Sequence, residues 1–337
     1  MLDRNQTAFD DPSSVGNPTS LRDYALLAGR GFLMGSADVV PGVSGGTIAF
    51  ITGIYQALIE AISAFNVAFV QRLLRLQLRE AFAGVPWRFL LALGTGIAAA
   101  ILTVSHGLSW ALEHYPTLVW GFFFGLVSAS ILVVRRQVKR WTPALIATAV
   151  LFTVGMYLLA GLIPAELPHT PLILFLSGAL ASCAMILPGI SGAFILVLVG
   201  QYPYVLQAVV DRRIGVLFLV AAGAALGLAL ASRALKWLFH HYHDVTVAAL
   251  TGLMLGSLRK VWPWKVTTAT QVTSTGEVIP LVQANVLPAG WSAEVAATIG
   301  LALLGFALVL AVEGLAQRVR SDRRTAVGPE TPQVERA

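Results

Sequence analysis

Long apolar runs make up most of the chain, and short polar or charged stretches separate them. A run of about 20 apolar residues is long enough for a helix to cross the hydrocarbon core of a bilayer. By this criterion the pattern predicts uninterrupted spans at about 87–112, 117–134, 142–163, 214–240, 245–262 and 294–316. We therefore expect an all-α polytopic membrane protein.

Two further apolar runs, at about 24–65 and 172–210, are each interrupted by a Pro-Gly pair, Pro41-Gly42 and Pro188-Gly189. Proline lacks a backbone N–H and clashes with the preceding turn, and glycine costs about 1 kcal/mol in a helix interior. A helix broken at membrane depth frees backbone polar groups, which must be buried in protein or line a wet cavity. Each run is therefore predicted to form a broken helix or a re-entrant hairpin, although Pro and Gly can also simply kink a membrane helix.

The two interrupted runs share a sequence pattern, which indicates an internal duplication. Both contain Pro-Gly-[Val/Ile]-Ser-Gly, then seven residues, then Gly-x-Tyr, at a constant spacing of 147 residues from Pro41 to Pro188. A Trp-x-x-x-His-Tyr pattern also recurs, at 110–115 and 237–242. Three predicted spans separate the interrupted runs, so the second run enters the membrane from the opposite side. This arrangement is typical of an inverted-topology repeat, which places the binding site of a transporter between its two halves.

The domain organisation follows from these breaks and from the polar segments. Residues 66–83 place Arg72, Arg75 and Arg79 among apolar positions, a pattern typical of an amphipathic helix on a membrane surface. The predicted order is a disordered tail at 1–20, a first repeat at 21–140, a connecting span at 141–171, a second inverted repeat at 172–262, an external loop at 263–292, a last span at 293–317 and a disordered tail at 318–337.

Composition and charge restrict the class of protein further. Hydrophobic residues make up 56% of the 337 residues and charged residues 12%, and the mean hydropathy is +0.75. Soluble domains carry about 25% charged residues, so the composition excludes that class. The net charge of +6 comes largely from clusters at segment ends, such as 135–140 and the arginines after residue 316. Because basic loops face the cytoplasm, we expect both termini on that side of the membrane.

The sequence contains no motif for a metal, a nucleotide or a catalytic centre. Its single cysteine, Cys183, excludes an intrachain disulfide framework and a cysteine-rich metal site. No Walker, GxGxxG or H-E-x-x-H pattern occurs, so we expect no cofactor, no drive by ATP and no enzyme activity. We assign no catalytic and no metal-binding residue.

The candidate substrate-binding residues follow the two breaks. Ser44-Gly45-Gly46-Thr47 and Ser191-Gly192 would each open a half-helix whose unpaired N–H groups and positive dipole end favour an anion. Glycine at these positions lets a ligand approach the backbone closely. Arg233, within a later span, could bind a phosphate through its guanidinium group or could extend to the membrane interface.

Asp38 lies three residues before Pro41, and two roles are open for it. A carboxylate at membrane depth is costly, which suits a group that couples transport to protons. Asp38 could instead accept hydrogen bonds from N–H groups that the break leaves unpaired, as a helix N-cap does. Its counterpart in the second copy is Met185, so the two half-sites are not chemically equal.

On the motifs at 35–47 and 188–192, the chain resembles the PopT-type polyprenyl-phosphate transporters, and the resemblance extends over about residues 22–317. It implies a carrier of the bacterial plasma membrane that returns undecaprenyl phosphate from the outer to the inner leaflet and uses an ion gradient. In the second copy Ala193 and Phe194 replace the Gly-Thr pair of the first. The motif positions that the resemblance carries over are Asp38, Pro41, Gly42, Ser44, Gly45, Gly46 and Thr47, and Pro188, Gly189, Ser191 and Gly192.

Two other functions remain open on the residues alone. A secondary transporter or channel for a small soluble anion would use the same helix ends. A membrane-embedded lipid phosphatase would need a nucleophile paired with a base, and no such pair is evident in the sequence. The expected partners are a polyprenyl-phosphate lipid and the membrane, and not nucleic acid, while the sequence leaves the oligomeric state open.

Overall fold

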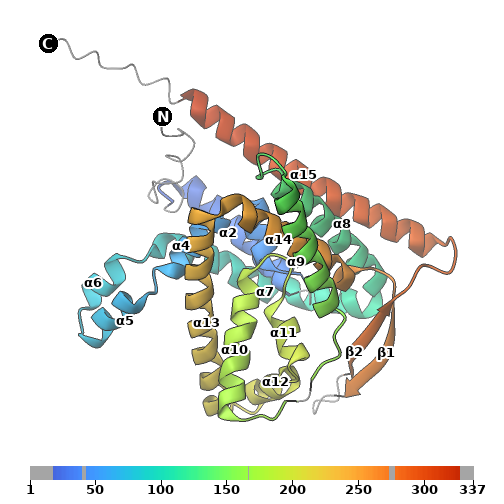
Figure 1. Ribbon diagram of the computed structural model, residues 1–337, viewed down its shortest axis with the longest axis horizontal. Helices are drawn as coiled ribbons and strands as arrows, with labels where there is room; N and C mark the ends of the chain where they lie inside the picture. Colours follow the sequence, from blue (N-terminus) through green and yellow to red (C-terminus); the bar gives the residue numbers. More distant parts are fainter. Residues whose placement is uncertain (1–17, 40–42, 166, 273–277, 327–337) are drawn as a thin grey trace.

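The protein, seen here in a computed structural model, is mostly helical (Figure 1). The structure describes residues 18–39, 43–165, 167–272 and 278–326. Five stretches in this part are long and apolar enough to cross a membrane, and a sixth is possible if one bent helix pair is counted as a span. The five are Tyr55–Leu74, Trp87–His114, Pro116–Arg135, Ile214–His241 and Ala293–Gly314. The prediction of a polytopic helical membrane protein is confirmed at this level.

The helices fall into two successive series. The first consists of α2 (Leu21–Asp38), α3 (Gly45–Ile51), α4 (Tyr55–Ser63), α5 (Val67–Leu74), α6 (Leu78–Ala83), α7 (Trp87–His114), α8 (Pro116–Arg135) and α9 (Pro143–Leu159). The second consists of α10 (Pro171–Ile186), α11 (Gly192–Leu198), α12 (Tyr202–Val210), α13 (Ile214–His241), α14 (His243–Val261), β1 (Lys265–Val272), β2 (Val278–Asn285) and α15 (Ala293–Ala326). Three matched pairs have equal lengths: 7 residues in α3 and α11, 9 in α4 and α12, and 28 in α7 and α13.

Helix starts follow local sequence. Thr142 and Thr170 each cap a helix whose first residue is proline, α9 and α10. Proline suits the first helical position because its missing N–H would have no partner there. Ser20 caps α2 by accepting from the Asp23 N–H, and the Asp23 carboxylate accepts from the Ser20 N–H in return. Such reciprocal caps stabilise a helix end by about 1 kcal/mol.

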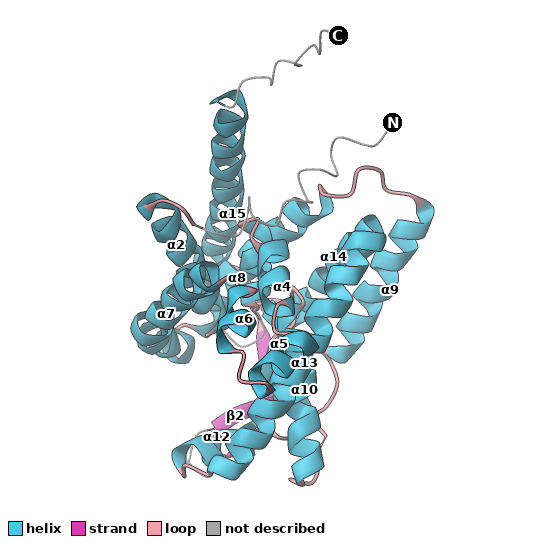
Figure 2. Cartoon of the chain, turned by 90° about the vertical axis from the view of Figure 1, so that its left-hand side faces the viewer, coloured by secondary structure: helices cyan, strands magenta, loops and turns pink. Residues whose placement is uncertain are grey.

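Four helix pairs form the scaffold: α2 with α7, α10 with α13, α8 with α15, and α9 with α14. The α9–α14 pair lies side by side in Figure 2. Glycines let these backbones touch, as small residues do in membrane helix pairs. A Cβ added at Gly96 on α7 would lie 1.9 Å from the Ala28 carbonyl oxygen, and one at Gly125 on α8 would lie 1.8 Å from the Ala302 carbonyl oxygen.

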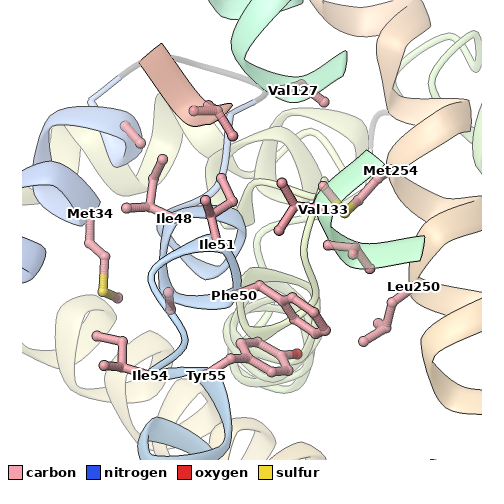
Figure 3. Close-up of a cluster of buried hydrophobic side chains, with 14 of the residues drawn as sticks. Met34, Ile48, Phe50, Ile51, Ile54, Tyr55, Val127, Val133, Leu250 and Met254 are labelled. Carbon is pink, nitrogen blue, oxygen red and sulfur yellow. The ribbon is translucent and has the colours of Figure 1, made fainter. Parts of the chain in front are cut away.

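The core gathers around α3 and α4. Phe50, Ile54 and Tyr55 pack with side chains from α8 and α14, including Val133 and Leu250 (Figure 3). All seven residues of α3 are buried. The half-helix that follows the first interruption therefore lies inside the protein and not against lipid, as its exposed N-terminal backbone groups require.

The corners between α7 and α8 and between α13 and α14 have the same geometry. Trp110 stacks on His114 with ring centroids 4.9 Å apart, and Trp237 stacks on His241 at 4.9 Å. Each histidine Nδ1 lies 2.9 Å from its tryptophan's carbonyl oxygen. Tyr115 has φ −134° and ψ 49°, and its counterpart in the second corner has φ −136° and ψ 49°. The Trp-x-x-x-His-Tyr pattern thus specifies one local structure twice.

The amphipathic segment predicted as one helix at 66–83 forms two, α5 and α6, which project from the left of Figure 1. The chain reverses at Leu76, whose φ is +59°. Phe69 and Phe82 face each other across the turn with ring centroids 5.7 Å apart. The single-helix prediction is therefore wrong, because contacts between aromatic side chains favour a hairpin here. Arg72, Arg75 and Arg79 are exposed as expected.

Two other predicted boundaries change. Within the expected external loop at 263–292, β1 and β2 pair antiparallel, with Lys265 opposite Asn285. Valine and threonine at alternating positions favour this extended pairing. The last helix continues to Ala326, past residue 317, because alanine, glutamine and arginine are good helix formers. The other predicted tail residues, 1–17 and 327–337, lie outside the described residues.

Candidate functional site

The two Pro-Gly motifs meet inside the protein. The Thr47 hydroxyl accepts a hydrogen bond from the Gly189 N–H at 3.1 Å. The Ser44 hydroxyl donates to the Met185 carbonyl oxygen at 3.2 Å. These contacts join residues 141 and 142 positions apart in the chain. The duplicated segments therefore form one structural centre. Pro41 and Gly42 lie outside the described residues.

The first half-site is closed by the chain's own carboxylate. Asp38 Oδ1 accepts from the Gly45 N–H at 2.6 Å, and the Ser44 hydroxyl accepts from the Gly46 N–H at 3.1 Å. The Thr47 N–H bonds to the Ser44 carbonyl oxygen at 2.9 Å. A Cβ at Gly45 would lie 2.4 Å from the Asp38 carboxylate, so a side chain there would displace Asp38 from the Gly45 N–H. The N–H groups of Gly45, Gly46 and Thr47 are thus occupied, with Ser44 as the N-cap of α3 and Asp38 as a second acceptor at the same helix end.

In the second half-site no described acceptor of the chain occupies the first N–H group of the helix, and in this sense we call it the open half-site. The α10 helix ends at Ile186, and Pro188-Gly189 forms a turn in which Gly189 has φ +91°. Ser191 occupies the N-cap position of α11, is 8% exposed and makes no capping hydrogen bond. Among the described residues no acceptor reaches the N–H of Gly192. The two copies therefore differ in occupancy, as the Asp38–Met185 difference in sequence suggests.

The half-helices after each break turn back at matched glycines. Gly53 has φ +73° and Gly200 has φ +71°, a conformation that glycine adopts at little cost. The α11 and α12 helices are bent by 110° at this point. The conserved spacing of the Gly-x-Tyr element within the duplication thus has a local cause, since both copies need a left-handed residue to reverse the chain.

Arg233 is not drawn into this centre by any described contact. It lies half-buried on α13, and the structure shows no hydrogen bond or ion pair from it to the described residues. Its assignment to the substrate site remains a prediction. The sequence assigns no site role to Tyr55, the tyrosine of the first Gly-x-Tyr element. In the structure its hydroxyl donates to the Ile186 carbonyl oxygen at 2.8 Å and joins the two motifs.

Replacing Tyr55 with phenylalanine should lower stability by about 1–3 kcal/mol, because the buried Ile186 carbonyl loses its described side-chain donor. The measurement is the apparent melting temperature of the purified protein in detergent. The matched control is Tyr115→Phe, whose ring is 52% exposed and should leave the melting temperature unchanged. Equal melting temperatures for Tyr55→Phe and the parent protein would contradict the joining role.

Sequence reasoning missed a second group of polar residues, Arg259, Lys260 and Lys265, at the end of α14 and the start of β1. Their position could have drawn attention to them, because the predicted topology places these cations on the outer side, where the positive-inside rule disfavours them. No group of three or more His, Cys, Asp or Glu side chains in the described part of the chain could hold a metal ion.

Comparisons with known proteins agree with the motifs. The family model described as undecaprenyl phosphate translocase-like matches residues 34–279. A polyprenyl-phosphate transporter of Vibrio cholerae is 43% identical over 259 residues, which cover 77% of this chain and 84% of the relative. A polyprenyl-phosphate transporter of Staphylococcus aureus is 29% identical over 255 residues, 69% of this chain and 84% of the relative. No solved structure matches the chain. The match over residues 34–279, which include both motifs, shows that the chain belongs to the undecaprenyl phosphate translocase-like family.

Proposed function

We propose that this protein moves polyprenyl phosphate, such as undecaprenyl phosphate, from the outer to the inner leaflet of the bacterial plasma membrane, driven by an ion gradient. The observation that carries the proposal is the contact between the two motifs, the second of which leaves the Ser191 hydroxyl and the Gly192 N–H without a described hydrogen bond. Family membership and the names of both relatives support the lipid substrate. The protein acts as a transporter and not as an enzyme.

We further propose that the two series of helices form an inverted repeat. Equal element lengths and the matched Trp-His-Tyr corners support a duplication. Three helices, α7, α8 and α9, separate the broken units, so the units start from opposite sides. The last helix of each series packs on a helix of the other series: α9 packs on α14, and α15 packs on α8. Rocking of such halves exposes a central site to each side in turn.

In this mechanism the phosphate headgroup binds at the open half-site while the prenyl tail stays in lipid. The Ser191 hydroxyl and the Gly192 N–H donate to phosphate oxygens, and charge-assisted bonds of this kind are about twice as strong as neutral ones. Arg233 is a further candidate donor, although no described contact joins it to the two motifs.

Asp38 supplies the coupling step in this proposal. Its carboxylate accepts from the Gly45 N–H, a donor that a phosphate at the first half-site would also use, so the two anions compete for it. Protonation removes the charge of Asp38 and weakens its hold on that N–H. Proton uptake therefore frees the first half-site for the headgroup. The capping role and the coupling role become two states of one residue.

The test of this function is translocation in proteoliposomes that contain undecaprenyl phosphate. An impermeant phosphatase added outside reports how much headgroup is accessible, and an imposed pH gradient reports the coupling. Translocation that depends on the protein supports the proposal. Uptake of inorganic phosphate without lipid translocation would instead support a carrier of a small soluble anion.

Ser191→Ala should raise the apparent KM for the lipid about tenfold, as expected when one hydrogen bond to a charged group is lost. It should leave the melting temperature unchanged, because the hydroxyl makes no capping bond in this structure. Ser44→Ala is the matched comparison: it removes the acceptor for the Gly46 N–H and should lower stability. An unchanged KM for Ser191→Ala would remove Ser191 from the substrate site.

A further inference from the structure

A polar cavity lies where the end of α14 meets α11 and the strand pair. Its wall includes the turn after α9, three positions of α11 and one edge of the hairpin. The aromatic, polar and charged residues in the wall are Phe194, Arg259, Lys260, Lys265, Gln283 and Asn285. Three of these six are cations.

Aromatic rings and carbonyl groups hold the three cations in place. Lys265 Nζ lies 3.8 Å from the centre of the Trp120 ring and donates to the Lys260 carbonyl oxygen at 2.5 Å. Lys260 Nζ lies 5.0 Å from the Phe194 ring centre. Arg259 lies over the Tyr157 ring and donates to the Tyr157 carbonyl oxygen at 2.9 Å. In the described part of the chain none of them forms a salt bridge with a carboxylate.

Such an arrangement is costly without a counter-ion. Burial and, to a smaller extent, the neighbouring charge of Lys260 together lower the pKa of Lys265 to about 7. A cluster of like charges raises the electrostatic energy of every member, and an anion placed among them reverses the sign of that energy. Gln283 and Asn285 add polar groups on the strand side. The cavity is thus suited to a multiply charged anion with several acceptor oxygens.

One short helix, α11, links the cavity to the open half-site. Phe194, in the cavity wall, lies three residues after the N-cap Ser191, and Leu198, also in the wall, ends α11. A helix rises 1.5 Å per residue, so Ser191 and Leu198 are about 10 Å apart along the axis. The cavity and Ser191 therefore lie along the same short helix.

We infer that this cavity is a phosphate-binding vestibule, in which Lys260 and Lys265 capture a phosphate monoester before it reaches Ser191. The inference rests on the proposed function for the direction of passage, because the predicted topology puts the end of α14 and the strand pair on the outer side. The ligand chemistry is a phosphoryl group, which either a lipid headgroup or free phosphate could supply.

The test compares binding of farnesyl phosphate, farnesol and inorganic phosphate to the full-length protein in detergent. Lys260→Gln with Lys265→Gln should weaken farnesyl phosphate binding at least about tenfold, while Lys260→Arg with Lys265→Arg keeps it near the parent value. Lys236→Gln, an exposed lysine on α13, is the control and should have no effect. Equal affinity of the double glutamine variant and the parent protein would overturn the inference, provided that melting temperatures agree.

The other probes identify the source of the phosphoryl group. Lysine-dependent binding of farnesyl phosphate alone supports a lipid headgroup, and equal lysine-dependent binding of inorganic phosphate supports free phosphate. Translocation measured in parallel separates this inference from the proposed function. Lysine-dependent binding without translocation keeps the vestibule and rejects the function, and translocation with lysine-independent binding does the reverse.

Discussion

Asp38→Asn is expected to lower gradient-driven lipid translocation about a hundredfold, the size of loss that follows removal of a positioned proton-transfer group, because asparagine cannot take up the proton that the proposed coupling requires. In the parent protein the Asp38 carboxylate accepts from the Gly45 N–H at 2.6 Å, and asparagine keeps an oxygen that can accept the same bond. It can neither carry the charge nor take up a proton. The fold should therefore remain intact while the competition between carboxylate and phosphate disappears.

The measurement is translocation in proteoliposomes with and without an imposed pH gradient, together with the melting temperature. Asp38→Ala removes the acceptor as well and should lower both activity and stability, which separates the cap from the charge. Glu80→Gln, an exposed acid on α6, serves as the control. Full activity of Asp38→Asn at every pH would show that Asp38 only caps α3.

Gly96→Leu is expected to destabilise the protein by about 3 kcal/mol or more, since overpacking against a backbone cannot be relieved by a rotamer change. The added Cβ alone would lie 1.9 Å from the Ala28 carbonyl oxygen and 2.8 Å from the Phe32 nitrogen. The α2 helix would have to move away from α7, and Asp38 at its end would move with it.

The matched control is Gly94→Leu, two residues earlier on the same helix, where an added Cβ meets nothing within 4 Å. That change should be neutral or slightly stabilising, because glycine is a poor helix former. Expression level and melting temperature in detergent report the difference. Similar behaviour of the two variants would mean that α2 and α7 are not packed as described.

The hydrophobic pattern predicted the long helices well and the short elements poorly. The spans expected at 87–112, 117–134 and 214–240 match α7, α8 and α13 within a few residues, because long apolar runs allow few other structures. The turn at Leu76 and the β1–β2 pair depend on contacts between segments, which a periodic pattern does not record. The end of α15 was set by helix propensity beyond the apolar run.

The candidate site was partly predictable for a similar reason. A duplicated Pro-Gly-x-Ser-Gly motif indicated two breaks, and the structure brings the described residues of both together. Sequence could not show that Asp38 fills the first half-site, since that depends on how the chain folds back by seven residues. Sequence did not single out Lys260 and Lys265 because cations at the ends of spans usually indicate only orientation. The position of these two lysines on the predicted outer side is nevertheless unusual.

The glycine contacts between paired helices determine which parts of the molecule can move. Where backbone touches backbone, as between α2 and α7 or between α8 and α15, sliding by even one ångström would produce a clash. In the proposed rocking mechanism each of these helix pairs therefore moves as a rigid unit. Relative movement is then expected at the other contacts between helices, which include α8 with α14, α4 with α13, and α3 with α8 and α10. Tyr55 on α4 and Thr47 on α3 make the hydrogen bonds that join the two motifs, so in this mechanism movement of α3 and α4 relative to α10 would break and remake those bonds.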